Sequence, residues 1–237
     1  MEFYQRLLAM DEVESADIAT NYRKDHELIE VYDELFLPAL ISARKDYLNE
    51  KLSDDHLDFI INTTGQLITR LGHLERSKTV TESAVPREGQ EVFGIPVEDT
   101  IDELVIAMLG HVLPEFVSLH AISTQALSGE IMEQLAERKP RVICIGAIVP
   151  GGWQEMRHLL KRIQSAFPNI PLVVARWGLQ NAKRERELFR ATAAQAVSTT
   201  LKSAQNHIVQ LLQLAPAPPL TLDFSQERVP AAHAGQN

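Results

Sequence analysis

The chain has 237 residues, which predicts one large domain or two small ones, because domains typically contain about 100–200 residues. Its 45% hydrophobic and 23% charged residues are typical of a globular protein and exclude a fibrous or wholly disordered chain. The single cysteine, Cys144, excludes a disulfide framework and a cysteine-based zinc cluster, and it favours a reducing, cytoplasmic location. The net charge of −9 argues against an extended nucleic-acid surface, so no nucleic-acid partner is expected.

No run of residues approaches the roughly 18 apolar residues that span a bilayer. The first residues, MEFYQRLLAMDEVE, lack the basic and apolar regions of a secretory signal. We therefore expect a soluble chain inside the cell. Membrane association is expected only through a transmembrane portion outside this sequence.

Residues 1–74 predict a four-helix-type bundle. Apolar residues recur there at spacings of three and four, the period of an amphipathic helix. Pro38 predicts either a kink at this position or a break near Leu37. Ser53 followed by three polar residues predicts the start of another helix. Residues 1–79 hold nine Lys or Arg and sixteen Asp or Glu, a balance of −7. Residues 75–90 show no apolar period and predict a linker.

Residues 91–214 alternate between short apolar runs and amphipathic segments, a pattern typical of an α/β domain. We predict strands at 92–95, 116–122, 141–149, 172–177 and 194–198, and helices at 100–112, 129–138, 153–167, 182–192 and 200–214. Five such pairs predict a five-stranded parallel sheet with helices on both faces. The run at 142–149 is continuously apolar, as a strand buried on both faces should be. Residues 215–237 predict a flexible tail.

Four segments of the chain resemble one known family. They are LLAMDEVESADIATNY at 7–22, VYDELFLPALISARKDYLNEKLS at 31–53, the long stretch from ISTQAL to VVARWG at 122–178, and AQAVSTTLKSAQNHIV at 194–209. In order and spacing they resemble the cobalamin-binding module of methyltransferases and light-sensing repressors, over about residues 3–213. The resemblance implies a helical cap followed by a flavodoxin-like domain.

The opening segments also have a narrower resemblance. FYQRLLAMD at 3–11 and YDELFLPAL at 32–40 are similar to the cytoplasmic C-terminal region of bacterial permeases of the autoinducer-2 exporter type. This resemblance implies that the chain is the soluble regulatory part of a membrane permease or a stand-alone relative of one. A membrane-transporter portion or a regulatory protein is then its expected partner.

The resemblance to cobalamin modules also implies a cobalt ligand, which this sequence lacks. The family holds cobalt with a His in a D-x-H-x-x-G turn after the first strand, and the Asp of that turn fixes the imidazole tautomer. The corresponding turn here, PVEDTIDEL at 96–104, contains neither His nor Gly. Asp99 or Asp102 stands in the place of the Asp, and no residue stands in the place of the ligand.

The other cofactor contacts of the family are altered as well. Its nucleotide slot is lined by small residues, whereas here the fourth strand ends in Ala175-Arg176-Trp177-Gly178. We expect Trp177 to fill that slot and to face the bundle. Ser123 supplies the hydroxyl that the family has in this slot. Tyr47 aligns with the Trp that covers the cofactor in light-sensing members, but their Glu-His pair is absent. Gly151 and Gly152 predict a tight strand-to-helix turn in preference to an anion cradle.

Our interpretation is a non-catalytic sensory or regulatory domain that keeps the cobalamin-module fold without the cofactor. No motif of a nucleophile elbow, phosphate loop, dinucleotide site or zinc protease occurs, so no enzyme activity is expected. The alternative is a ligand-binding sensor that controls transcription and holds cobalamin without a protein His, haem or another flat chromophore between bundle and sheet. The candidate crevice residues are Tyr47, Asp99, Thr100, Ser123, Gln125, Gly151 and Trp177. The sequence leaves open whether the chain forms an oligomer.

Overall fold

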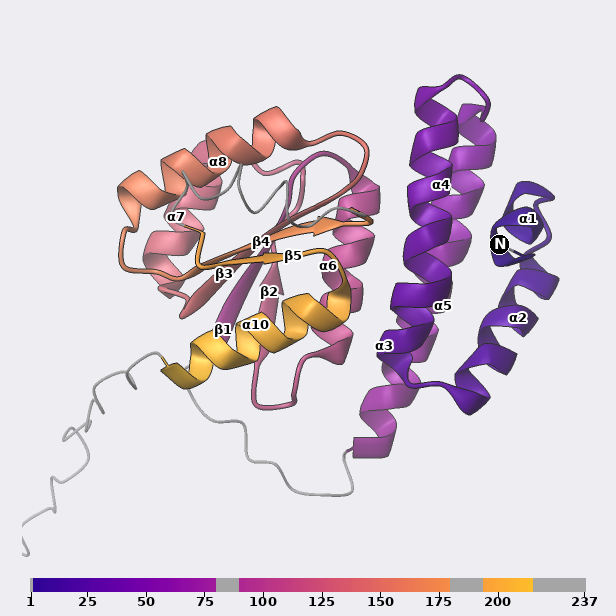
Figure 1. The fold of residues 1–237 in the computed structure, drawn as a ribbon, viewed down its shortest axis with the longest axis horizontal. Coiled ribbons are helices and arrows are strands. Elements are labelled where there is room, and N and C mark those ends of the chain that lie inside the picture. Colours follow the sequence, from indigo (N-terminus) through magenta and orange to yellow (C-terminus); the bar gives the residue numbers. More distant parts are fainter. Residues whose placement is uncertain (1, 80–89, 180–193, 215–237) are drawn as a thin grey trace, which may run out of the picture.

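The protein is described by a computed structural model, which covers residues 2–79, 90–179 and 194–214. A bundle of helices stands beside an α/β unit, and the two lie flank to flank (Figure 1). In the part of the chain described, no helix is both long enough and apolar enough to cross a bilayer.

The bundle confirms the helical prediction for the first part of the chain. Its elements are α1 (Glu2–Leu8), α2 (Glu12–Asp25), α3 (Leu28–Glu30), the π-helix η1 (Val31–Phe36), α4 (Leu37–Leu48) and α5 (Asp54–Thr79). Ser53 precedes α5 and caps it, as expected, because its hydroxyl accepts a hydrogen bond from the His56 amide at 3.4 Å. The irregularity expected at Pro38 is the π-helical stretch of η1, which ends immediately before α4. Proline has no backbone N–H to donate to a helical hydrogen bond. The wider turn of the π-helix allows the chain to stay helical through Pro38.

Helix α5 extends further than the sequence predicts. Helix α5 continues to Thr79, so residues 75–79 belong to the bundle. Glu75 forms an ion pair with Arg23 of α2, with a nitrogen–oxygen distance of 2.5 Å, and this contact supports the last turns of α5 against the bundle. Residues 80–89, the helix predicted at 182–192 and the tail at 215–237 lie outside the described residues.

The α/β part is the five-stranded parallel sheet that the sequence predicts. Its strands β1 (Glu91–Pro96), β2 (Ser118–Ala121), β3 (Val142–Ile148), β4 (Leu172–Trp177) and β5 (Ala196–Ser198) lie in the order β2-β1-β3-β4-β5. All four neighbouring pairs are parallel. The second strand starts at Ser118, two residues later than predicted, because the backbone turns at residues 114–117, where the Val117 amide donates to the Pro114 carbonyl.

Helices cover both faces of the sheet, as expected. The described helices are α6 (Thr100–Val112), α7 (Ser128–Arg138), α8 (Trp153–Ala166) and α10 (Leu201–Leu214). Residues of α7 and α8 share one apolar cluster with one face of the sheet. Residues of α6 and α10 share a second cluster with the opposite face. Cys144 is buried in that second cluster, as its position in the central strand predicts.

The second cluster does not stop at α6 but continues into the bundle. It joins Phe3, Phe36 and Ile60 of the bundle to Val105 of α6 and Trp177 of β4, all almost fully buried. Helix α5 packs closely on α6, where Gly72 leaves room for the imidazole ring of His111. Bundle and sheet are therefore held by one continuous hydrophobic core, whose burial is the dominant favourable term in folding.

A polar contact also joins η1 of the bundle to α10, the last of the described helices. Asp33 of η1 accepts hydrogen bonds from the backbone amides of Leu201 and Lys202, at 2.7 and 3.0 Å. These amides begin α10 and have no partner within that helix. Asp33 thus serves as an N-terminal cap for α10, supplied by the bundle. Burial raises the pKa of the Asp33 carboxyl, against the lowering effect of these two hydrogen bonds.

The close approach of α5 and α6 predicts a cost for any side chain at position 72. In Gly72→Ala the added Cβ would collide with the His111 ring, and overpacking of this kind costs typically 1–3 kcal/mol. We expect a loss of about 2 kcal/mol in the free energy of unfolding, measured by urea denaturation. Gly129→Ala is the matched control, because a Cβ at this position in α7 meets nothing within 4 Å. Equal stabilities of the two variants would contradict the packing described here.

Candidate functional site

Arg44 of α4 extends from the bundle into the carboxyl edge of the sheet. Its side chain is only 3% exposed. One guanidinium nitrogen lies 3.0 Å from the Asp102 carboxylate and 3.6 Å from that of Glu98, and it donates to the Ile148 carbonyl at 3.2 Å. The other nitrogen pairs with Asp99. We call Arg44, Glu98, Asp99 and Asp102 the Arg44 cluster.

Asp102 is the innermost acid of the Arg44 cluster and is fully buried. Its two carboxylate oxygens accept hydrogen bonds from the backbone amides of Ile148 and Glu98, each at 3.0 Å. Burial raises the pKa of Asp102 to about 6, since the loss of solvent outweighs the opposing attraction of Arg44. The carboxylate therefore fastens the end of β3 to the turn after β1.

Asp99 and Glu98 occupy the turn between β1 and α6. Asp99 caps α6, because its carboxylate accepts from the Ile101 amide at 2.8 Å. The Glu98 carboxylate lies over the glycine turn after β3, where Gly151 and Gly152 have φ of +104° and +67°. Gly152 begins α8, so the structure shows the tight strand-to-helix turn that these glycines predict. Arg176 donates to the Gly151 carbonyl at 2.7 Å and holds the same turn from β4.

Trp177 lies at the end of β4, on the sheet face that the bundle and α6 cover. It is fully buried, and its six-membered ring fills the space over Gly146 of β3 where a Cβ would lie. The indole N–H has no hydrogen-bond partner among the described residues. The next residue, Gly178, lies against the Ile41 side chain of α4. The expectation that Trp177 faces the bundle agrees with this packing.

Ser123 and Gln125 stand in the turn after β2, and an acid of α6 engages that turn. The Ser123 hydroxyl donates to Glu103 at 3.0 Å, and the Thr124 amide donates to the same oxygen at 2.6 Å. The Gln125 amide in turn donates to the Ser123 hydroxyl at 3.2 Å. Together the Ser123 and Thr124 hydrogen bonds lower the pKa of Glu103, against the opposing effect of its partial burial. The hydroxyl predicted for a nucleotide slot thus holds a loop in place.

The remaining two predicted residues contribute less to the edge. Thr100 is the exposed first residue of α6. Tyr47 lies near the end of α4 with 38% of its surface exposed, and its hydroxyl donates to Asp54 at 2.9 Å. The structure therefore joins Asp99 to the Arg44 cluster, places Gly151 under Glu98, and leaves Tyr47 fastened to the start of α5.

Sequence reasoning missed Arg44, the residue around which this edge is organised. A signal for it exists, because Arg44 follows Leu37, Leu40 and Ile41 at helical spacing and so continues the apolar face of its helix. A charged residue on such a face needs a buried partner. Three acids at 98, 99 and 102 on another element supply it.

The comparisons with known proteins concern the fold. No family model and no curated protein matches this chain. Among solved structures, the monomethylamine corrinoid protein of Methanosarcina barkeri has a TM-score of 0.64 at 8% identity, with 89% of this chain and 96% of that chain covered. The fold is that of a cobalamin-binding module.

Two further structures match with lower TM-scores. A cobalamin-binding protein from Desulfitobacterium hafniense DCB-2 has a TM-score of 0.42 at 9% identity, covering 89% of this chain and 97% of that one. The methanol:cobalamin methyltransferase complex of Methanosarcina barkeri has a TM-score of 0.44 at 9% identity, covering 89% and 78%. At such identities the likeness extends to the fold alone.

Removal of the buried guanidinium should cost far more than removal of an exposed one. Arg44→Met would leave Asp102 buried without its partner, and breaking a buried pair typically costs about 3–5 kcal/mol. Arg6→Met is the matched control, because Arg6 pairs with Glu14 at 3.0 Å with side chains 39% and 46% exposed, where such pairs contribute at most about 1 kcal/mol. Urea denaturation of both variants measures the difference. A loss below about 1 kcal/mol in Arg44→Met would show that the cluster does not hold bundle and sheet together.

Asp102 and His111 should change the free energy of unfolding in opposite directions as the pH changes. The Asp102 pKa is raised in the folded protein to about 6, so its favourable contribution is present below the unfolded value and is lost as pH rises through 6. Burial lowers the pKa of His111 to about 4, so its contribution is present above about 6.5 and is lost as pH falls through 4.

Urea denaturation between pH 4 and 7.5 tests both signs. The stability of the wild type relative to Asp102→Asn should increase by about 2.4 kcal/mol as pH falls from 7 to 4. The stability of the wild type relative to His111→Gln should decrease over the same interval. Two curves that slope in the same direction would contradict the buried placement of one of the two groups.

Proposed function

We propose that this chain is a non-catalytic regulatory domain that keeps the cobalamin-module fold without the cofactor. The observation that carries the proposal is Arg44. Its guanidinium, supplied by the helical bundle, occupies the edge of the sheet at the turn where cobalamin modules carry their cobalt ligand. An internal side chain, neutralised by the acids of that turn, stands where a cofactor would have to enter.

The turn between β1 and α6 does not fit a corrinoid ring below the bundle. Glu98, Asp99 and Asp102 direct their carboxylates to Arg44, and no His stands in the turn. His111 belongs to the same helix but lies at its other end, where it contacts Tyr32 at 3.1 Å. Displacing Arg44 would leave the Asp102 carboxylate buried without its counter-ion, which is strongly unfavourable.

The slot that would take a nucleotide tail is also filled. The Trp177 ring covers Gly146, Ile41 covers Gly178, and the Ser123 hydroxyl is engaged by Glu103. Cores of this kind are packed to the density of organic crystals, so a ligand could enter only by moving Trp177 out. The same packing disfavours haem or another flat chromophore in this crevice.

We propose that the domain is not catalytic because its buried acid, Asp102, is already bound by other groups of the protein. Asp102 has the pKa of a useful general base, near 6, but its oxygens are bound by two backbone amides and Arg44 and are inaccessible to solvent. A general base must reach the proton that it abstracts, within hydrogen-bond distance or through one water. Asp102 therefore has a structural role.

A regulatory role follows from where these contacts lie. The Arg44 cluster and the Asp33 cap both join the bundle to the α/β part. A partner with different affinities for two arrangements of these parts would shift the equilibrium between the two arrangements. We propose a protein partner for this domain. That the partner is a transporter rests on the resemblance of residues 3–11 and 32–40 alone.

Reconstitution with cobalamin tests the proposal. The purified chain is mixed with hydroxocobalamin or adenosylcobalamin, the free cofactor is removed, and the visible spectrum is recorded. We expect no stoichiometric cobalt spectrum with the wild type. A stoichiometric, protein-shifted spectrum would overturn the proposal.

A double variant, Arg44→Met with Trp177→Ala, tests whether these two side chains are the reason why cobalamin does not bind. If these side chains alone keep cobalamin out, the folded double variant gains some affinity while the wild type has none. Haemin, followed by its Soret band, is the second probe. A shifted, stoichiometric Soret band in the wild type would favour the chromophore-binding sensor instead.

A further inference from the structure

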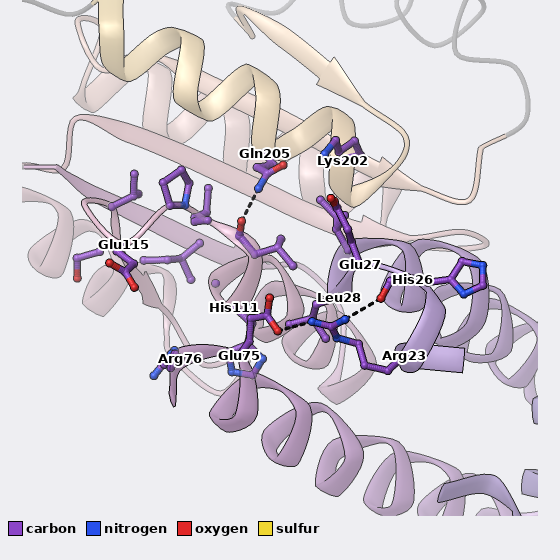
Figure 2. A pocket seen from close by; sticks show the side chains of 18 of the residues that line it. Arg23, His26, Glu27, Leu28, Glu75, Arg76, His111, Glu115, Lys202 and Gln205 are labelled. Carbon is purple, nitrogen blue, oxygen red and sulfur yellow. Dashed lines mark hydrogen bonds and ion pairs between the residues drawn. The ribbon is translucent and has the colours of Figure 1, made fainter. Parts of the chain in front are cut away.

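A groove of about 1200 Å³ lies between the bundle and the α/β part, far from the Arg44 cluster. Its walls come from the connection between α2 and α3, the end of α5, the end of α6 with the start of β2, and the first turns of α10 (Figure 2). His111 lines the groove and Asp102 belongs to the cluster. Nine residues of α6 separate them, or about 14 Å along the helix axis.

The floor of the groove is apolar and comes from both parts of the molecule. Leu28 and Ile29 belong to the bundle, whereas Leu113, Val117 and Leu119 follow α6. Pockets that bind small molecules typically combine such a floor with a few convergent polar groups. A ligand with an apolar portion would bury it against both parts at once.

The polar groups of the groove are balanced in charge. Among its described lining residues, Arg23, Lys24, Arg76 and Lys202 are cationic, and Asp25, Glu27, Glu75 and Glu115 are anionic. Such a lining favours neither a net anion nor a net cation. It suits a molecule that carries one charge of each sign.

The most enclosed ionic groups present both signs side by side. Arg23 and Glu75 form their ion pair with side chains 22% and 34% exposed, and Arg23 also donates to the His26 carbonyl at 2.7 Å. Figure 2 shows the Arg23 guanidinium reaching across to Glu75 at this wall. An ammonium group could pair with Glu75 while a carboxylate pairs with Arg23, so a zwitterion could satisfy both.

The neighbouring polar groups add uncharged hydrogen-bonding positions. His111 is held by its contact with the Tyr32 hydroxyl, and the side-chain amide of Gln205 donates to the Val112 carbonyl. These bonds fix the walls at the ends of α6 and α10. A ligand would therefore meet a largely preformed site, which lowers the entropic cost of binding.

We propose that this groove binds a small zwitterion with apolar side chains, of the class of an apolar amino acid or a short apolar peptide. Its ammonium and carboxylate groups pair with Glu75 and Arg23, and its side chains lie on Leu28 and Leu113. The ligand bridges bundle and sheet and stabilises their packed arrangement. This site goes beyond the proposed function and does not depend on the state of the Arg44 cluster.

Calorimetric titration of the full chain tests the proposal with four probes. They are L-leucine and the dipeptide leucyl-leucine as zwitterions, octanoate as an anion and hexylamine as a cation. We expect one of the zwitterions to bind with a Kd of about 1 mM or tighter, and both singly charged probes to bind at least about fivefold more weakly. Absence of binding by both zwitterions up to about 10 mM, or equal affinity for octanoate, would overturn the proposal.

Three variants locate the binding site. Arg23→Gln should weaken the zwitterion at least about fivefold, whereas Arg6→Gln, which removes an ion pair elsewhere in the bundle, should leave its affinity unchanged. Glu75→Gln gives the lining one excess positive charge and should raise the affinity for octanoate relative to the zwitterion, a change that mere loss of structure would not produce. Unchanged affinities and selectivity in Arg23→Gln and Glu75→Gln would place binding elsewhere and overturn the assignment. A cobalamin spectrum from the wild type, by contrast, would overturn the proposed function and leave this site standing.

Discussion

The buried guanidinium of Arg44 is the interaction on which the arrangement of this molecule depends. It comes from the bundle, is only 3% exposed, and meets Asp99, Asp102 and the Ile148 carbonyl on the α/β part. A buried charge is tolerated only with well-placed partners, so Arg44 stabilises the arrangement of bundle and sheet in which its two terminal nitrogens meet these groups. Hydrophobic burial supplies most of the attraction between the two parts, and the ionic cluster selects their register.

The edge of the sheet where ligands of open α/β folds usually bind is therefore occupied by the protein itself. Arg44, Trp177 and Ile41 lie where the bundle meets the ends of β1, β3 and β4. The fold of a cobalamin-binding module is compatible with such a change, because fold and function are inherited separately. The opposite end of α6 keeps an open, polar and apolar groove. The groove that we propose as a binding site thus lies at the opposite end of α6 from the Arg44 cluster.

Periodicity alone predicted most of the fold, because each helix and strand buries its own apolar stripe or run. It failed where a distant contact decided the outcome. Glu75 extends α5 by pairing with Arg23, 52 residues earlier, and no local pattern announces this. The turn at 96–104 and the bulky Trp177 were found from sequence, since each is recognised within one contiguous segment. Arg44 and the groove were not, because their partners come from elements that only the packed bundle brings together.

The cap that Asp33 provides for α10 bears on how this protein is divided. Residue 33 completes the start of a helix 168 positions further along the chain. Without the bundle, α10 would begin with two unpaired amides, and α6 would expose the face that lies against Gly65 and Gly72 of α5. The α/β part therefore takes two of its helix contacts from the bundle. Genetic exchange that moved one part without the other would leave α10 without its cap and this face of α6 uncovered.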